Sequence, residues 1–202
     1  MEVKLQTPLT KDKLLNLKAG DSVLLSGVIY SARDAAHKRL IDLLDEGKEL
    51  PLSIKDETIY YVGPSPAKPG MVIGSAGPTT SYRMDAYAPT LMDLGLKGMI
   101  GKGARNEEVI DAIKRNKAVY FGAIGGAAAL IGKSIVKSEI IAYEDLGAEA
   151  IRKMEVKDMP LVVIIDSEGN NLYELGKQNY LNSVKAHERK NKSNFHFLIV
   201  PK

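Results

Sequence analysis

Apolar and polar residues alternate in short blocks along the chain, and the blocks change between two spacings. Short runs of β-branched and apolar residues, bounded by glycine, proline or aspartate, predict strands. These runs are residues 2–5, 22–30, 58–61, 71–76, 98–103, 118–122 and 135–146. Apolar residues three and four positions apart predict helices instead. They predict one helical turn at 14–15 and longer helices at 32–49, 84–94, 106–116 and 147–158.

Capping and turn signals set several of these boundaries. Gly47 ends the helix predicted at 32–49, and Asn106 is placed to cap the helix that follows it. Residues 160–176 predict a hairpin with its tip at 168–170. The order of strand, turn, helix and strand predicts a layered domain of the α/β class, with glycine-rich strand-to-helix turns.

The length of 202 residues suits one domain with a small appendage. We assign residues 1–180 to the domain and 181–202 to a basic C-terminal extension packed on it. Residues 177–202 carry six lysines and arginines against one glutamate, so the rest of the chain is slightly acidic. A solvated charge run is the favoured interpretation of residues 185–192, and nucleic-acid binding is the disfavoured one, because aromatic residues for base stacking are sparse.

The residue types present exclude several kinds of site. The chain has no cysteine, which excludes disulfides, thiolate zinc sites and a self-contained iron–sulfur cluster. Its three histidines are scattered without metal-ligand spacing, so we predict no metal site on this chain. No apolar run approaches the roughly 20 residues of a membrane span, and the N-terminus does not resemble a signal peptide. We therefore expect a cytoplasmic protein without membrane association.

Three glycine-bearing turns follow predicted strands, at residues 74–80, 101–103 and 122–126. In α/β sheets, ligands gather at the carboxyl ends of strands, and glycines there let a ligand approach the backbone. The first turn leads into Thr79, Thr80 and Arg83, and the second contains Lys102. Hydroxyls and cations in these positions predict a site for a carboxylate or a phosphate.

Each of these residues also has a structural interpretation. Thr79 or Thr80 could simply cap a helix, and Arg83 could be a solvated or salt-bridged surface residue. The glycine spacing does not match a P-loop, and it gives little support for a dinucleotide site. The recurrence of three such turns favours one anion site over three coincidences.

A further cluster of charges begins the helix predicted at 32–49. Arg33, Asp34 and His37 fall in its first turns, together with Lys38 and Arg39. Cations at a helix N-terminus oppose the helix dipole, which is most easily tolerated where a bound anion cancels them. The alternative is a solvated helix face on which Asp34 offsets the local charge.

Three segments together resemble a known family. They read GVIYSARDAAHKRL, GSAGPTTSYRMDAYAPTLMDLGLKGMIGKG and AVYFGAIGGAAAL, and the match runs from about residue 10 to about 180. In this combination the chain resembles the β subunit, or C-terminal domain, of class I iron–sulfur fumarate hydratases. The β subunit of L-tartrate dehydratase belongs to the same family. The resemblance identifies residues 1–180 as a fumarase-type catalytic domain.

The resemblance implies a heteromeric hydro-lyase, with a swivelling β/β/α fold whose sheet is mixed rather than purely parallel. A cysteine-bearing α subunit would hold a [4Fe–4S] cluster, whose unligated iron acts as a Lewis acid on a C4 dicarboxylate. An α2β2 assembly or a β dimer is the implied form.

The resemblance also assigns roles to individual residues. Arg33 and Arg83 match arginines that bind the dicarboxylate, and Lys102 matches a substrate-binding lysine. Thr79 matches a threonine proposed to transfer a proton, with Thr80 and Gly77 beside it in the substrate loop. A threonine hydroxyl is a poor base unless a neighbour accepts its proton, and the α subunit would supply that neighbour. The remaining motif residues, which orient the substrate-binding groups, are Asp34, His37 and Asp85.

Two alternatives remain open at the level of function. The same groups would hold tartrate, so a tartrate dehydratase β subunit is the closest rival. The chain also lacks a complete catalytic set of its own, which leaves a non-catalytic module that binds a dicarboxylate or phosphate.

Overall fold

The computed structural model describes residues 2–123, 128–178 and 180–181. The strands are β1 (Glu2–Gln6), β2 (Ser22–Ser31), β3 (Thr58–Tyr60), β4 (Gly98–Gly101), β5 (Val119–Gly122), β6 (Ile135–Ala142) and β7 (Ile151–Ile165). The α-helices are α1 (Lys11–Leu14), α2 (Asp34–Asp45), α3 (Ala88–Asp93), α4 (Glu107–Asn116) and α5 (Ala128–Ser134). Two 3₁₀ helices, η1 (Ser81–Met84) and η2 (Glu144–Glu149), complete the set, and residues 172–178 are helical.

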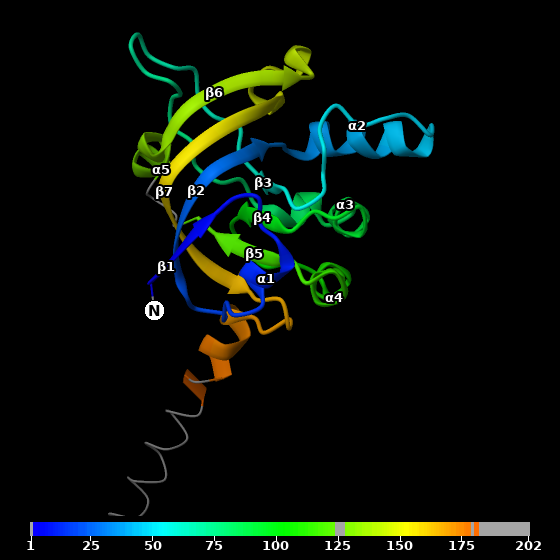
Figure 1. Cartoon of the computed structure of the whole chain (residues 1–202), viewed down its shortest axis with the longest axis vertical. Coiled ribbons are helices and arrows are strands. Elements are labelled where there is room, and N and C mark those ends of the chain that lie inside the picture. Colours follow the sequence, from blue (N-terminus) through cyan, green and yellow to red (C-terminus); the bar gives the residue numbers. More distant parts are fainter. Residues whose placement is uncertain (1, 124–127, 179, 182–202) are drawn as a thin grey trace, which may run out of the picture.

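The sheet is mixed and closes into a barrel-like ring. Strands β2, β3, β4 and β5 pair in parallel in that order, and β7 then pairs antiparallel with both β5 and β2. The ring closes because β7 is 15 residues long and can pair on both sides as it curves. Strand β1 lies beside β2, and β6 lies beside β7 (Figure 1). The predicted mixed sheet is confirmed, and the swivelling, layered description remains a prediction.

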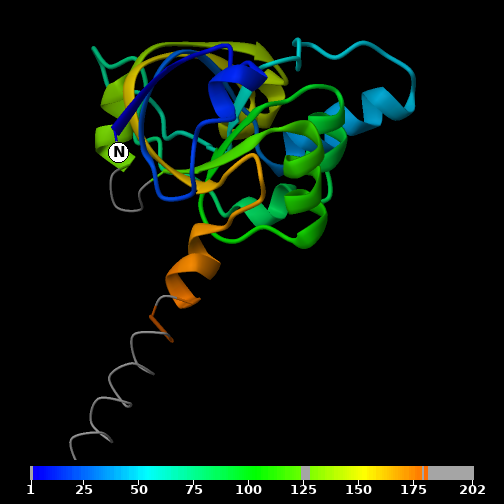
Figure 2. The same cartoon turned by 60° about the horizontal axis from the view of Figure 1, so that its bottom comes forward.

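The two faces of the ring build two separate cores. Successive strand residues point to opposite faces, and Tyr60 and Phe121 accordingly pack into the inner cluster while their neighbours Tyr61 and Tyr120 pack into the outer one. The outer cluster contains the apolar residues of α2, α3 and α4, which gather on one side of the ring (Figure 2). This arrangement leaves the turns after β3 and β4 at the boundary between sheet and helices.

Most of the predicted elements are present. Helix α4 begins as predicted, with the Asn106 side chain accepting a hydrogen bond from the Val109 N–H. The helix predicted at 84–94 is shorter, because η1 and a turn precede α3. In the part of the chain described here, no helix is long and apolar enough to cross a membrane.

The strand predicted at 71–76 is wrong. These residues form an irregular loop, and the Met71 and Val72 side chains are 51% and 49% exposed. The loop folds back on Ser65, whose N–H donates to the Ser75 carbonyl and whose Oγ accepts from the Ser75 N–H. A Cβ added to Gly74 would lie 2.4 Å from the Ser65 Oγ, so the glycine permits this close approach. The glycine turn at 74–80 therefore follows a loop rather than a strand.

The helix predicted at 147–158 is also wrong, because most of it is the first half of β7. Ile151 and Met154 are three positions apart, which is a helical spacing. The buried residues that follow are two positions apart, as in a strand: Met154 and Val156, and then Met159 and Leu161. The alternation shifts at a bulge, where Asp158 has a φ of 47°. A long antiparallel pairing with β2 overrides the local helical pattern.

The hairpin predicted at 160–176 is correct only at its turn. The Asp166 carboxylate accepts hydrogen bonds from the N–H groups of Glu168 and Asn170. The returning arm pairs only through one bridge, between Ile165 and Asn171, and residues 172–178 are then helical. The predicted extension at 181–202 lies outside the described residues beyond position 181 and stays a prediction.

Candidate functional site

Two loops that follow neighbouring parallel strands lie side by side. Thr80 and Lys102 form a parallel bridge, and the Ser81 N–H donates to the Lys102 carbonyl over 2.9 Å. The Thr79 N–H donates to the Tyr61 carbonyl, directly after β3, over 2.7 Å. Both threonines and Lys102 therefore lie near the carboxyl ends of β3 and β4, and their role in binding a ligand stays a prediction. Ligand sites in α/β folds lie at this kind of edge.

Two arginines meet at one carboxylate. Arg83 Nη2 donates to Asp34 Oδ2 over 2.6 Å, and Arg33 Nη2 lies 3.7 Å from Asp34 Oδ1. Arg33 Nη2 also pairs with Glu149 Oε1 at 3.1 Å, and its Nε is buried without a partner among the described residues. Side chains that are 50 positions apart in the sequence are thus brought together at the start of α2.

The charge at the start of α2 is balanced by the chain's own acids. Glu149 accepts a hydrogen bond from the Ala35 N–H over 3.2 Å, in the first turn of the helix, where a negative charge is favourable. Lys38 and Arg39 pair with Asp42 and Asp145 on the exposed surface of the helix. Lys38 and Arg39 are therefore not part of the cluster around Arg33. Their charges are neutralised by Asp42 and Asp145, so they require no bound anion.

His37 supports Arg33 from behind. Its Nδ1 donates to the Arg33 carbonyl over 2.8 Å, and its ring makes an edge contact with Tyr61 at a centroid distance of 5.4 Å. Desolvation lowers the pKa of the fully buried imidazole to about 4, although the Arg33 carbonyl raises that pKa. His37 is therefore uncharged at neutral pH. It positions the Arg33 backbone, and it carries no positive charge that could attract an anionic ligand.

Because His37 is buried in its neutral form, we expect the folded protein to become less stable in mild acid. Its folded-state pKa of about 4 is below the unfolded value of about 6.5, so the unfolded chain binds a proton first as the pH falls. The stabilisation that neutral His37 gives to the folded state is fully present above the unfolded-state pKa. It is lost as the pH falls from about 6.5 towards 4. We expect the free energy of unfolding to fall by about 2 kcal/mol between pH 7 and pH 5 from this side chain.

Urea unfolding of the wild type and of His37→Asn at several pH values measures this contribution. The asparagine amide can keep the hydrogen bond to the Arg33 carbonyl but does not titrate, and the carboxylates common to both proteins cancel in the comparison. Identical slopes of stability against pH in the two proteins would contradict the assignment.

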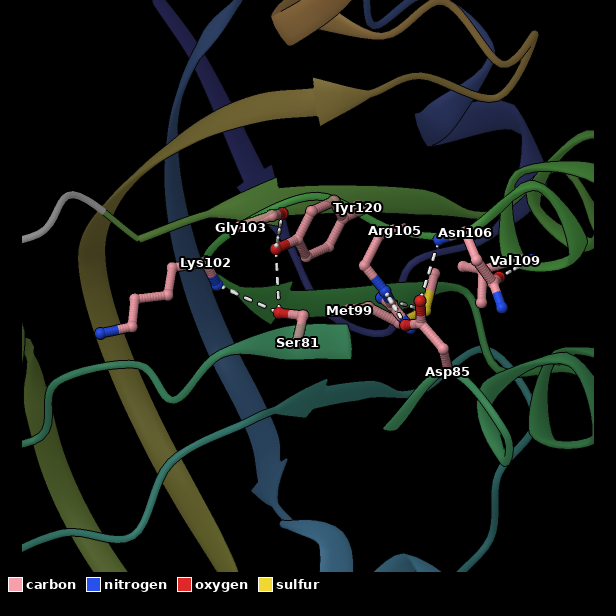
Figure 3. A network of polar contacts seen from close by, with 9 residues as sticks. All are labelled: Ser81, Asp85, Met99, Lys102, Gly103, Arg105, Asn106, Val109 and Tyr120. Atoms are coloured by element: carbon pink, nitrogen blue, oxygen red, sulfur yellow. Dashed lines mark hydrogen bonds and ion pairs between the residues drawn. The ribbon is translucent and has the colours of Figure 1, made fainter. Parts of the chain in front are cut away.

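Asp85 lies behind the two loops and not on their surface. Its carboxylate accepts from Arg105 Nε over 2.6 Å and from the Asn106 N–H over 2.9 Å. Arg105 is buried between the rings of Tyr61 and Tyr120, at 5.4 and 5.0 Å from their centroids. Figure 3 shows its pairing with Asp85. The ion pair joins the end of η1 to the start of α4, which suits the predicted orienting role of Asp85.

The threonine loop is closely packed and leaves its hydroxyls available. Thr80 occupies the N-cap position of η1, but its side chain makes no capping hydrogen bond. The capping interpretation therefore does not account for Thr80. A Cβ added to Gly77 would lie 3.1 Å from the Ala128 Cβ, so this glycine permits tight packing against the start of α5.

Lys102 stands at the rim of a hollow. Its side chain points away from the Arg105–Asp85 pair in Figure 3, and no described residue pairs with its ammonium group. A cavity of about 300 Å³ adjoins it, at the ends of β4 and β5 and against residues 172–173. That volume is at the lower end of the range for small-molecule sites. An unpaired cation beside such a cavity suits an anionic ligand.

Sequence reasoning missed three residues of this site. Arg105, Ser81 and Tyr120 were not singled out, although all three are buried polar or aromatic residues that join the predicted loops. The only available signal for Arg105 was its position just before the helix cap Asn106. The third predicted glycine turn lies largely in residues 124–127, outside the described residues.

These contacts belong to a mixed α/β domain whose sheet closes into a barrel-like ring. A family model described as "Fumarase C-terminus" matches residues 1–176. The chain belongs to this family, and the resemblance to class I fumarate hydratases and tartrate dehydratase β subunits is thereby confirmed.

Named relatives give the same result. The chain is 44% identical over 152 residues to "Fumarate hydratase class I, anaerobic" of Escherichia coli, covering 74% of this chain and 28% of that protein. It is 37% identical over 177 residues to "Fumarate hydratase 2" of Leishmania major, covering 86% and 31%. It thus spans less than a third of the length of these two relatives.

A relative of similar length has a different name. The chain is 37% identical over 172 residues to the "Putative L(+)-tartrate dehydratase subunit beta" of Methanocaldococcus jannaschii. The match covers 82% of this chain and 88% of that protein. The relatives are thus named hydro-lyases, either as long single chains or as a separate subunit.

Proposed function

We propose that the chain is the β subunit of an iron–sulfur hydro-lyase that reversibly hydrates fumarate to (S)-malate. The observation that carries the proposal is the junction of Arg33 and Arg83 at Asp34, beside the Thr80–Lys102 bridge. Arg33 and Arg83 meet at one carboxylate, and Lys102 pairs with the loop that leads to Arg83. We infer that the three cations together bind the two carboxylates of a two-headed acid.

The chemistry explains why cations are required. Malate dehydration removes a weakly acidic C–H proton next to one carboxylate and expels hydroxide from the neighbouring carbon. The negative charge that develops on that carboxylate needs positive charge on its oxygens, which Arg33, Arg83 and Lys102 supply. Holding both carboxylates also orders the reacting carbons.

Thr79 is the candidate for proton transfer at the carbon next to the carboxylate. Its backbone is fixed by the hydrogen bond to the Tyr61 carbonyl. Thr80 and Gly77 shape the loop around the substrate, while Asp34, His37 and Asp85 orient the binding groups. A partner residue must accept the proton from Thr79, because a threonine hydroxyl alone is a poor base.

The residues of this chain do not suit the cluster that the family implies. The sequence has no cysteine, and the described residues contain no group of three or more histidines and acids that could hold a metal ion. We therefore place the [4Fe–4S] cluster on a cysteine-bearing α subunit and assign no reaction step to it here. The 88% coverage of a protein named as a β subunit supports a two-chain enzyme. An α2β2 assembly or a β dimer follows as part of the proposal.

Tartrate is the second candidate substrate. The relative of similar length carries that name, and the same three cations would hold either diacid. The additional hydroxyl of tartrate would have to be recognised by the partner or by a side chain near the threonine loop. A non-catalytic module that binds a dicarboxylate or phosphate is the third candidate, because this chain lacks a complete catalytic set.

Co-expression with cysteine-bearing candidate partners tests these three functions. The complex is purified without oxygen, and turnover of fumarate, malate and tartrate is followed by absorbance. We expect no activity from the isolated chain, and faster turnover of malate than of tartrate by the complex. Turnover of malate no faster than that of tartrate would favour the tartrate dehydratase, and a chain that no partner activates would favour the binding module.

A further inference from the structure

A chain of hydrogen bonds ties the start of η1 to the loop after β4. The Lys102 N–H donates to Ser81 Oγ over 3.1 Å, Ser81 Oγ lies 2.9 Å from the Tyr120 hydroxyl, and that hydroxyl donates to the Gly103 carbonyl over 3.0 Å (Figure 3). A phenol hydroxyl can donate only one hydrogen bond, and here the Gly103 carbonyl accepts it. The Ser81 hydroxyl must therefore donate to the Tyr120 oxygen, which fixes the direction of every bond. We call Ser81 and Tyr120 the hydroxyl relay.

The hydroxyl relay is buried and leaves no free space. Ser81 and Tyr120 have no exposed surface, and a Cβ added to Gly101 would lie 2.0 Å from the Ser81 Oγ. The Ser81 N–H also donates to the Lys102 carbonyl, so both backbone groups of Lys102 bond to Ser81. The position of the Lys102 backbone is thus set by one serine.

The far end of η1 is tied to the same loop. Asp85 follows η1 and binds both Arg105 and Asn106, as described above. Arg83 lies between these two attachments, within the four residues of η1. The two attachments therefore fix the segment that bears Arg83 relative to the segment that bears Lys102.

We propose that Ser81 and Tyr120 are positioning residues that set the distance between Arg83 and Lys102 without contacting the substrate. This inference rests on the proposed function, in which those two cations bind one diacid. A displacement of about 1 Å at reacting groups can cost about 100-fold in rate, even when the altered residue is remote. Loss of the Ser81 hydroxyl removes the acceptor of the Lys102 N–H, and loss of the Tyr120 hydroxyl removes the bond that holds the Ser81 hydroxyl in place. Either loss leaves a buried polar group unpaired.

Kinetics of Ser81→Ala and Tyr120→Phe in the reconstituted complex test the proposal. We expect kcat for fumarate to fall about 10- to 100-fold in each variant while KM changes less than about 3-fold. Because the two hydroxyls act as one relay, the double variant should be no slower than about the slower single variant. Tyr120→Phe keeps the ring that packs on Arg105. The matched control is Ser134→Ala, which removes a 2.7 Å hydrogen bond to the Ile131 carbonyl in α5, and we expect it to keep the wild-type kcat.

Hydrogen exchange on the isolated chain supplies a readout that does not require activity. The Lys102 amide should be protected in the wild type and should exchange more than about 10-fold faster in Ser81→Ala, with no such change in Ser134→Ala. Unchanged protection would show that the relay does not hold Lys102 and would overturn the proposal.

The two proposals fail in different ways. An active wild-type complex whose Ser81→Ala variant keeps the wild-type kcat overturns the positioning role alone. Additive losses in the double variant would likewise contradict a single relay. A wild-type chain that no partner activates overturns the proposed function, and the positioning role with it.

Discussion

Replacing Arg83 by methionine should lower kcat/KM for fumarate hydration by about 100- to 1,000-fold in the reconstituted complex, which corresponds to about 3–4 kcal/mol. Arg83 is 41% exposed in this chain and already donates to Asp34, so its planar fork is oriented before substrate binds. Methionine has a similar length but no charge. The loss arises because one substrate carboxylate would be left without its charged partner inside the closed site. Steady-state kinetics of the complex measure the effect.

Arg115→Met is the matched control. Arg115 also pairs with an aspartate, since its Nε and Nη2 donate to Asp93 over 2.8 and 2.7 Å. This pair joins α3 and α4 on the exposed surface, away from the strand-end loops, so we expect kcat/KM within about 2-fold of the wild type. A wild-type kcat/KM in Arg83→Met would remove Arg83 from the site.

The second large effect is on stability. We expect Asp85→Asn to lower the free energy of unfolding of the isolated chain by about 3–5 kcal/mol. The Arg105 side chain is fully buried, and Asp85 is the only described residue that neutralises it with an ion pair. Asparagine would leave a buried guanidinium without a counter-charge, although the two tyrosine rings remain against it. Urea unfolding monitored by circular dichroism measures the change.

Asp93→Asn provides the comparison for this stability effect. It removes the same charge from an ion pair whose members are both about half exposed, and such pairs contribute less than about 1 kcal/mol. If Asp85→Asn destabilised the chain no more than Asp93→Asn does, the buried Asp85–Arg105 pair would not be important for the stability of the fold.

Local sequence patterns predicted the elements that local chemistry determines. Asn106 caps α4 because its side chain bonds three residues ahead, which is visible in the sequence alone. The helix predicted at 147–158 is wrong because the spacing of Ile151 and Met154 matches a helix, whereas pairing with β2 makes them part of β7. The closure of the ring depends on that pairing, which joins segments far apart in the sequence and which no local pattern indicates.

The site shows the same division. The motifs indicated Arg33, Arg83, Thr80 and Lys102. The structure brings Arg33 and Arg83 to Asp34 and pairs Thr80 with Lys102, while their binding of a substrate stays a prediction. Arg105 and Tyr120 escaped notice because their roles arise only when η1, β5 and the loop after β4 pack against each other. Their partners are 20 and 39 positions away, at Asp85 and Ser81, and no local pattern indicates such pairings.

The proposed function requires that Arg33, Arg83 and Lys102 bind one dicarboxylate. The most direct measurement is a crystal structure of the complex with (S)-malate bound. We expect the two guanidinium groups and the ammonium group all to lie within hydrogen-bond distance of the malate carboxylates. Malate bound elsewhere, or bound with any two of these three side chains turned away from it, would contradict the account.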